Sequence, residues 1–154
     1  MTALDLATAV IEAFSSAPRP AAAEIAPHAF CEECADVAAY LEGRDPLAFD
    51  NEALLGCIWD LPLLSAEAKR YYLPAWLLAS ISDPQGADAT DALVYALDSD
   101  HRWEPDGGYT EAQRAVIVRY LESLIEQLDD ETGFFWPFLQ RALERWANWP
   151  RPAA

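Results

Sequence analysis

Apolar side chains recur every three or four residues along most of this chain, which is the spacing of one buried face of an α-helix. The first such stretch covers residues 2–16, with apolar positions at Leu4, Ala7, Val10, Ile11 and Phe14. A shorter stretch over residues 32–41 repeats the same spacing. No segment alternates apolar and polar residues clearly enough to predict a strand, so the pattern predicts an all-α fold.

Side chains that can cap a helix mark where several of these helices begin. Asp50 and Ser65 each precede a stretch of helical spacing and can accept a hydrogen bond from its first turn. Thr110 and Gln113 have the spacing of a capping box at the start of the clearest helix. Pro74 lies inside the helix that follows Ser65 and predicts a kink or a split there, because proline has no backbone N–H.

Two apolar stripes in the last third of the chain predict a pair of antiparallel helices. The first stripe is Ile117, Leu121, Leu124 and Leu128. The second stripe is Phe135, Leu139, Ala142 and Trp146. Only the short segment 129–133 separates the two helices, which is typical of a helical hairpin.

With 154 residues, the chain has the usual size of one domain. We predict a single helical domain over residues 1–154, a bundle of about six helices that ends in the antiparallel hairpin. Residues 17–30 are rich in Pro and Ala and interrupt the helical pattern, so they are predicted to form a connector. Residues 147–154 are predicted to form a tail.

The charge of the chain narrows the choice of partners. Because 53% of the residues are apolar, the chain can bury a core, and its 26 acidic side chains against 10 basic ones must then lie on the surface. Nucleic acids and anionic membranes are not expected to bind a net charge of -16, since both select basic surfaces. A basic protein is the expected partner, and the same charge could equally serve solubility alone.

The negative charge is concentrated toward the N-terminus. Residues 1–60 carry 11 acidic and 2 basic side chains, whereas residues 110–154 carry 7 acidic and 5 basic ones. The first of these segments includes Glu32, Glu33 and Asp36, which we single out as candidate partner-binding residues.

Three residues have the chemistry and spacing of a metal half-site. His28, Cys31 and Cys34 offer an imidazole and two thiolates within seven residues, and zinc prefers both kinds of ligand. A fourth ligand would have to come from elsewhere, with Cys57 first and His101 second. The alternative is that the two thiols simply pack at the start of a helix. A redox role for the same pair is disfavoured by Glu32 and Glu33, which oppose a thiolate there.

No residue pattern in this sequence clearly indicates a catalytic site. The many carboxylates allow an acid–base pair, but no spacing singles one out. The chain has no glycine-rich phosphate loop and no recognisable nucleophile motif. The sequence therefore favours a protein that is not an enzyme.

The chain resembles a bacterial family of small proteins with a domain of unknown function. The resemblance rests on a His-x-x-Cys-Glu-x-Cys motif at His28–Cys34, an Arg-Tyr-Tyr-Leu-Pro-Ala motif at Arg70–Ala75, and Asp83-Pro84. It spans roughly residues 8–128. The resemblance implies a single cytoplasmic domain. Because the family has no established activity, the resemblance supplies no catalytic residues.

These observations lead to one main hypothesis and two alternatives. The first is a non-enzymatic acidic module that masks a basic surface of another protein, because bacterial immunity proteins and antitoxins are often small, acidic and helical. The alternatives are a small zinc-stabilised domain and an enzyme that uses a carboxylate pair. The cytoplasm is the expected location, because the first residues lack a basic leader pattern and the number of cysteines is odd. The oligomeric state stays open.

Overall fold

Helices are the only regular secondary structure among the residues that the structure describes, which are 1–85, 88–98, 108–128 and 136–148. The structure is a computed structural model. In chain order the elements are α1 (Ala3–Phe14), a 3-10 helix η1 (Ala22–Glu24), α2 (Glu32–Leu41), α3 (Asn51–Leu55), a second 3-10 helix η2 (Leu61–Leu63), α4 (Ala66–Ser82), α5 (Ala89–Asp98), α6 (Glu111–Gln127) and α7 (Trp136–Ala147). The all-α prediction is confirmed, with seven α-helices in this part of the chain where about six were expected.

The predicted caps lie where the helices begin. Asp50 and Ser65 each accept a hydrogen bond from the backbone N–H three residues later, at the starts of α3 and α4. Thr110 and Gln113 form the capping box at the start of α6, with hydrogen bonds of 3.1 and 2.9 Å. These side chains satisfy N–H groups that have no partner inside the helix.

Helix α4 continues through Pro74 without a break, so the predicted split does not occur. Proline removes one backbone hydrogen bond from the helix. Around it, however, the side chains from Tyr72 to Leu77 are all buried, and this packing holds the two halves of the helix together. Tertiary burial therefore outweighs the local preference of one residue.

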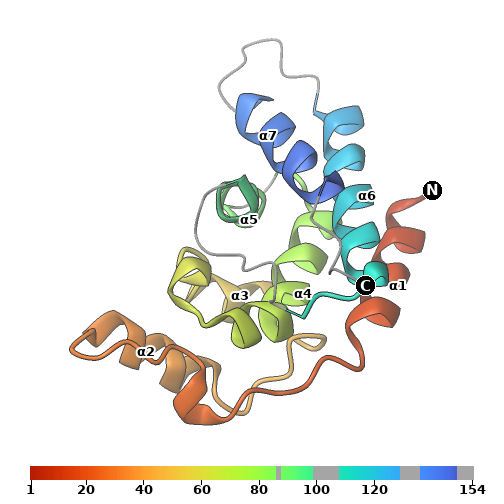
Figure 1. The fold of residues 1–154 in the computed structure, drawn as a ribbon. Helices are drawn as coiled ribbons and strands as arrows, with labels where there is room; N and C mark the ends of the chain where they lie inside the picture. Colours follow the sequence, from red (N-terminus) through yellow and green to blue (C-terminus); the bar gives the residue numbers. More distant parts are fainter. Residues whose placement is uncertain (86–87, 99–107, 129–135, 149–154) are drawn as a thin grey trace.

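Helix α4 is at the centre of the arrangement (Figure 1). Helices α1 and α5 pack against α4, α6 packs against α1, and α7 packs against both α5 and α6. Helices α6 and α7 lie side by side and run in opposite directions, as the prediction of a C-terminal hairpin required (Figure 1). One continuous cluster of buried side chains joins these helices, with Trp76, Trp146, Tyr72 and Tyr120 as its largest fully buried members.

The connector over residues 17–30 is ordered and pinned to the start of α4. Ile25 and Ala26 are buried in the core. The backbone N–H of Ser65 donates to the carbonyl oxygen of Ile25 at 2.8 Å, and the Ser65 hydroxyl donates to that of Glu24 at 2.6 Å. Helix α2 follows this connector and lies at the edge of the molecule, away from α6 and α7 (Figure 1).

Candidate functional site

The two cysteines of the predicted half-site lie at the N-terminus of α2 and are joined by a disulfide. Cys31 is the N-cap residue of the helix, and its Sγ accepts a hydrogen bond of 3.1 Å from the backbone N–H of Cys34. Cys34 is only 2% exposed, whereas Cys31 keeps a partly exposed side chain. The pair therefore joins one partly exposed cysteine, which packs against the edge of the core, to one enclosed cysteine.

His28 is exposed beside this pair in the sequence, but its imidazole contacts another segment. Its Nε2 lies 3.1 Å from the carbonyl oxygen of Leu63 and donates to it. That contact leaves Nδ1 as the imidazole nitrogen that could bind a metal. Within the described residues, no three side chains of His, Cys, Asp or Glu are placed together so as to hold a metal ion. Because a disulfide has no thiolate, a zinc site here requires the reduced pair.

The predicted fourth ligands are placed as follows. Cys57 is a buried free thiol, and burial, followed by the negative charge of Asp60, raises its pKa to about 12. A thiol that holds its proton so strongly is a poor metal ligand unless the site rearranges. His101 lies outside the described residues.

Phe30 precedes the disulfide and is held in an unusual backbone conformation. Its φ angle is 60°, the only positive φ of a non-glycine residue among the described residues. Its side chain is fully exposed, at 107% of the reference area. The left-handed region costs a non-glycine residue about 1–2 kcal/mol. The fold thus keeps a large apolar ring in solvent at a cost, immediately before Cys31.

The acidic side chains of α2 are exposed on the same part of the molecule. Glu32 and Glu33 form the first turn of α2, and Asp36 follows one turn later; all three are exposed. Burial, followed by the nearby charge of Glu33, raises the pKa of Asp60. The charge of Glu33, in the first turn of α2, thus acts on Asp60, the residue before η2.

A second exposed aromatic residue is next to Asp60 in the sequence. Trp59 directly precedes Asp60 and is 54% exposed. Tyr40, in the last turn of α2, ties this helix to α3, because its hydroxyl donates to the carbonyl oxygen of Ala53 at 2.6 Å. We call the set Phe30, Glu32, Glu33, Asp36, Trp59 and Asp60 the acidic face.

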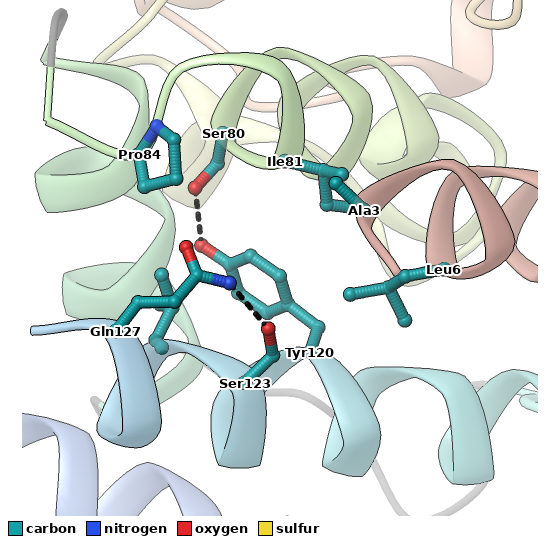
Figure 2. Close-up of a pocket in the computed structure, with 9 residues that line it drawn as sticks. Ala3, Leu6, Ser80, Ile81, Pro84, Tyr120, Ser123 and Gln127 are labelled. Carbon is teal, nitrogen blue, oxygen red and sulfur yellow. Dashed lines mark hydrogen bonds between the residues drawn. The ribbon is translucent and has the colours of Figure 1, made fainter. Parts of the chain in front are cut away.

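A small pocket lies between α1, α4 and α6 (Figure 2). Its lining is Ala3, Leu6, Ser80, Ile81, Pro84, Tyr120, Ser123, Leu124 and Gln127. The space for water-sized molecules is about 10 Å³, which is about enough for a single water. Its lining includes no acidic, basic, His or Cys side chain, and the Tyr120 hydroxyl is its only group of the acid–base type.

The polar groups at the back of this pocket satisfy one another. The Ser80 hydroxyl lies 2.5 Å from that of Thr90 and 2.7 Å from that of Tyr120, which joins α4, α5 and α6 (Figure 2 shows the Ser80–Tyr120 contact). Burial is the main cause that raises the pKa of Tyr120, so its hydroxyl stays protonated. The cluster is accounted for by buried hydrogen bonding that ties three helices together.

The carboxylates of the described residues do not form a buried pair. Asp98 has a largely covered side chain, 7% exposed, Asp60 is partly covered, and the others are exposed. Asp98 is occupied by a bidentate contact with Arg141, with two hydrogen bonds of 3.0 Å. This distribution is typical of a solvated acidic surface.

Sequence reasoning missed Asp60 and two aromatic residues of the acidic face, Phe30 and Trp59. A periodic pattern marks residues that are buried on a helix face, but both of these are exposed outside the helices. The one available signal was the position of Phe30 directly before Cys31, and Trp59 had none.

No helix in the described part of the chain has both the length and the apolar character needed to cross a membrane. Comparison with curated proteins and with solved structures finds no match. Comparison with protein families gives one match, over residues 5–149, which is a wider range than the resemblance noted in the sequence. The chain therefore belongs to a family of unknown function, DUF6714.

Proposed function

We propose that this protein is a non-enzymatic binding module whose acidic face docks on a basic surface of another protein. The observation that carries the proposal is Phe30, a fully exposed ring in a left-handed backbone conformation beside Glu32 and Glu33. An exposed aromatic side chain that is maintained at an energetic cost is typical of a binding surface.

The composition of the acidic face suits such a partner. Aromatic side chains are common anchors of protein interfaces, and Phe30 and Trp59 supply two of them. The surrounding carboxylates attract a positively charged surface over a Debye length of about 8–10 Å and speed its approach. The aromatic residues would hold the partner and the carboxylates would attract it. Immunity proteins and antitoxins mask basic partners in this way, and the analogy with them rests on charge, size and helical fold.

The first experiment is affinity capture from lysate of the source cells with charge-matched variants. The acidic-face variant is Glu32→Gln, Glu33→Gln and Asp36→Asn. The control removes the same number of charges from exposed positions on α6 and α7, as Glu122→Gln, Glu126→Gln and Glu144→Gln. We expect wild type and control to capture the same basic protein and the acidic-face variant to lose it.

The captured protein is then purified for measurement of association kinetics. Its association rate constant with the wild type should fall at least ~10-fold between low and physiological salt, because screening removes the electrostatic attraction. Capture that is equal for all three forms, or an association rate that does not change with salt, would refute the proposal.

A further inference from the structure

The disulfide at the start of α2 differs from a purely structural crosslink in the length of the loop it closes and in the exposure of its two cysteines. Cys31 and Cys34 are only three residues apart, so their bond closes a very short loop and removes little entropy from the unfolded chain. Cys34 is enclosed, and Cys31 is partly exposed at the N-cap of a ten-residue helix. Of the two cysteines, Cys31 is thus the one that keeps some exposure to solvent, and Cys34 is covered.

The backbone at the helix start favours negative charge on the Cys31 sulfur, which opposes the effect of Glu32 and Glu33 that led us to disfavour a redox role from the sequence. The backbone N–H of Cys34 points at Cys31 Sγ from 3.1 Å, and it can donate to a thiolate as well as to a disulfide sulfur. Cys34 has no such exposure, and its side chain is packed in the core beside Val37 and Leu41 of the same helix. In the disulfide form the two cysteines are therefore unequal in exposure and in their contact with the backbone.

We infer that Cys31 and Cys34 form a thiol–disulfide exchange site, in which Cys31 is the attacked sulfur and positively charged thiols are the preferred substrates. The exchange chemistry does not rest on the proposed binding function. The charge preference uses Glu32 and Glu33, which also belong to the acidic face.

The exchange proceeds in two balanced steps. The thiolate of a first substrate thiol attacks Cys31 Sγ, the Cys31–Cys34 bond breaks, and Cys34 leaves with the electron pair and takes up a proton. This step gives a mixed disulfide between Cys31 and the substrate. A second substrate thiolate then attacks the substrate sulfur of the mixed disulfide and releases Cys31 as a thiolate. Two thiols have been oxidised to one disulfide, and the protein has been reduced to its dithiol.

The local charge selects among substrates. Glu32 and Glu33 directly follow Cys31 and are exposed, and neither has a basic neighbour in α2. An approaching anionic thiolate is repelled by both carboxylates, whereas a thiol that carries an ammonium group is attracted. The matching protein substrate is a cysteine surrounded by Lys or Arg, and the matching small molecule is an aminothiol.

The test begins with oxidised protein carrying Cys57→Ala, which removes the remaining thiol. Cysteamine, 2-mercaptoethanol and 2-mercaptoethanesulfonate serve as cationic, neutral and anionic probes, and the first adduct is located by peptide mass spectrometry. We expect the adduct on Cys31, and a cationic-to-anionic rate ratio that is about 3-fold to 10-fold higher than in the Glu32→Gln, Glu33→Gln variant. High salt, at which the Debye length falls to about 3 Å, should remove this difference.

Single-cysteine variants, made in the Cys57→Ala background, give an independent measurement. The Cys34→Ser variant leaves Cys31 as a thiol, and it should react with cystamine at least ~10-fold faster than the Cys31→Ser variant, in which Cys34 is enclosed. Circular dichroism of both variants shows whether each is folded. If one variant is not folded, the position of the adduct in the oxidised protein alone decides whether Cys31 is the attacked sulfur.

Three results would overturn the inference. They are an adduct divided equally between the two cysteines, a disulfide that is reduced only when the protein unfolds, and a rate ratio that does not change when Glu32 and Glu33 are neutralised. Failure of the binding proposal is distinguishable, because a Cys31→Ser, Cys34→Ser variant keeps the acidic face and can be used in the capture experiment.

Discussion

The hydroxyl of Tyr72 donates a hydrogen bond of 2.9 Å to the backbone carbonyl oxygen of Leu41, and this bond joins the middle of α4 to the last residue of α2. Tyr72 is 1% exposed and Leu41 is fully buried. Helix α2 is otherwise peripheral, so the contact fixes the end of the helix whose start carries the disulfide and the acidic face.

Replacement of Tyr72 by Phe should therefore destabilise the protein by about 1–3 kcal/mol, because the carbonyl of Leu41 stays buried without its donor. Tyr71→Phe is the matched control, since the Tyr71 hydroxyl accepts only an exposed hydrogen bond from Arg19 at 3.0 Å. Urea unfolding at pH 7 measures the stability of both variants. Equal midpoints for the two variants would show that the Tyr72–Leu41 bond contributes nothing.

The Ser80 cluster is expected to behave as one unit. Ser80→Ala leaves the hydroxyls of Thr90 and Tyr120 without their shared partner, at a cost of about 1–3 kcal/mol. A double-mutant cycle with Tyr120→Phe should show a coupling energy of about 0.5–3 kcal/mol. Ser123→Ala, at the exposed hydrogen bond with Gln127, is the control and should cost no more than about 0.5 kcal/mol. Additive effects of the Ser80 and Tyr120 variants would contradict the network.

Asp60 makes the stability depend on pH in a predictable direction. Burial and the charge of Glu33 raise its pKa in the folded state above the ordinary value of 3.8. The folded state then binds more protons than the unfolded state, so this contribution is present below the unfolded-state pKa and is lost as pH rises through the folded-state pKa.

The Asp60→Asn variant should accordingly lose less stability than the wild type between pH 3.5 and pH 7. Asp36→Asn, on the exposed side of α2, controls for the removal of one charge. Unfolding midpoints across this range test the prediction. It fails if the two variants show the same pH dependence.

Cys57 provides a reporter of unfolding. Its pKa of about 12 leaves a thiolate fraction on the order of 10⁻⁴ at pH 8, and its side chain is buried. The folded, oxidised protein should show no thiol that reacts with Ellman's reagent within minutes, and one thiol after addition of urea. A second reactive thiol in urea would mean that the Cys31–Cys34 disulfide is not fully formed.

The zinc hypothesis applies to the reduced protein and stays a prediction. Reduced, untagged protein should bind one equivalent of zinc through His28, Cys31 and Cys34, and its melting temperature should fall on chelation. His28→Ala is the matched variant, because His28 is exposed and its loss should lower affinity more than stability. Less than half an equivalent of zinc in the metal analysis, with melting unchanged by chelation, would exclude the site.

Helices and their starting points were predictable because they depend on local rules. Asp50, Ser65 and Thr110 cap the helices that their positions predicted, and the stripes of α6 and α7 do pack together. Pro74 was misread as a point of division because its buried surroundings were invisible in the sequence.

The candidate site was only partly predictable. The position of Cys31 and Cys34 at a helix start followed from the pattern, but the disulfide depends on a Cα–Cα distance of 5.2 Å and on redox conditions, neither of which a sequence contains. The nearness of Glu33 to Asp60 depends on how the segment after α2 turns back toward it. Long-range placement of this kind cannot be read from local spacing.

The hydrogen bonds of Ser65 bear on where the chain can accept insertions and deletions. The Ser65 hydroxyl caps α4 and also donates to the carbonyl oxygen of Glu24, and the Ser65 N–H donates to that of Ile25. The chain therefore leaves this point at residue 25 and returns to it 40 residues later. Residues 26–64, which carry α2 and α3, thus form a side lobe with a closed base. Loop entropy grows slowly with length, so relatives should be able to lengthen or shorten the surface turns of this lobe without shifting the register of the helices beneath it.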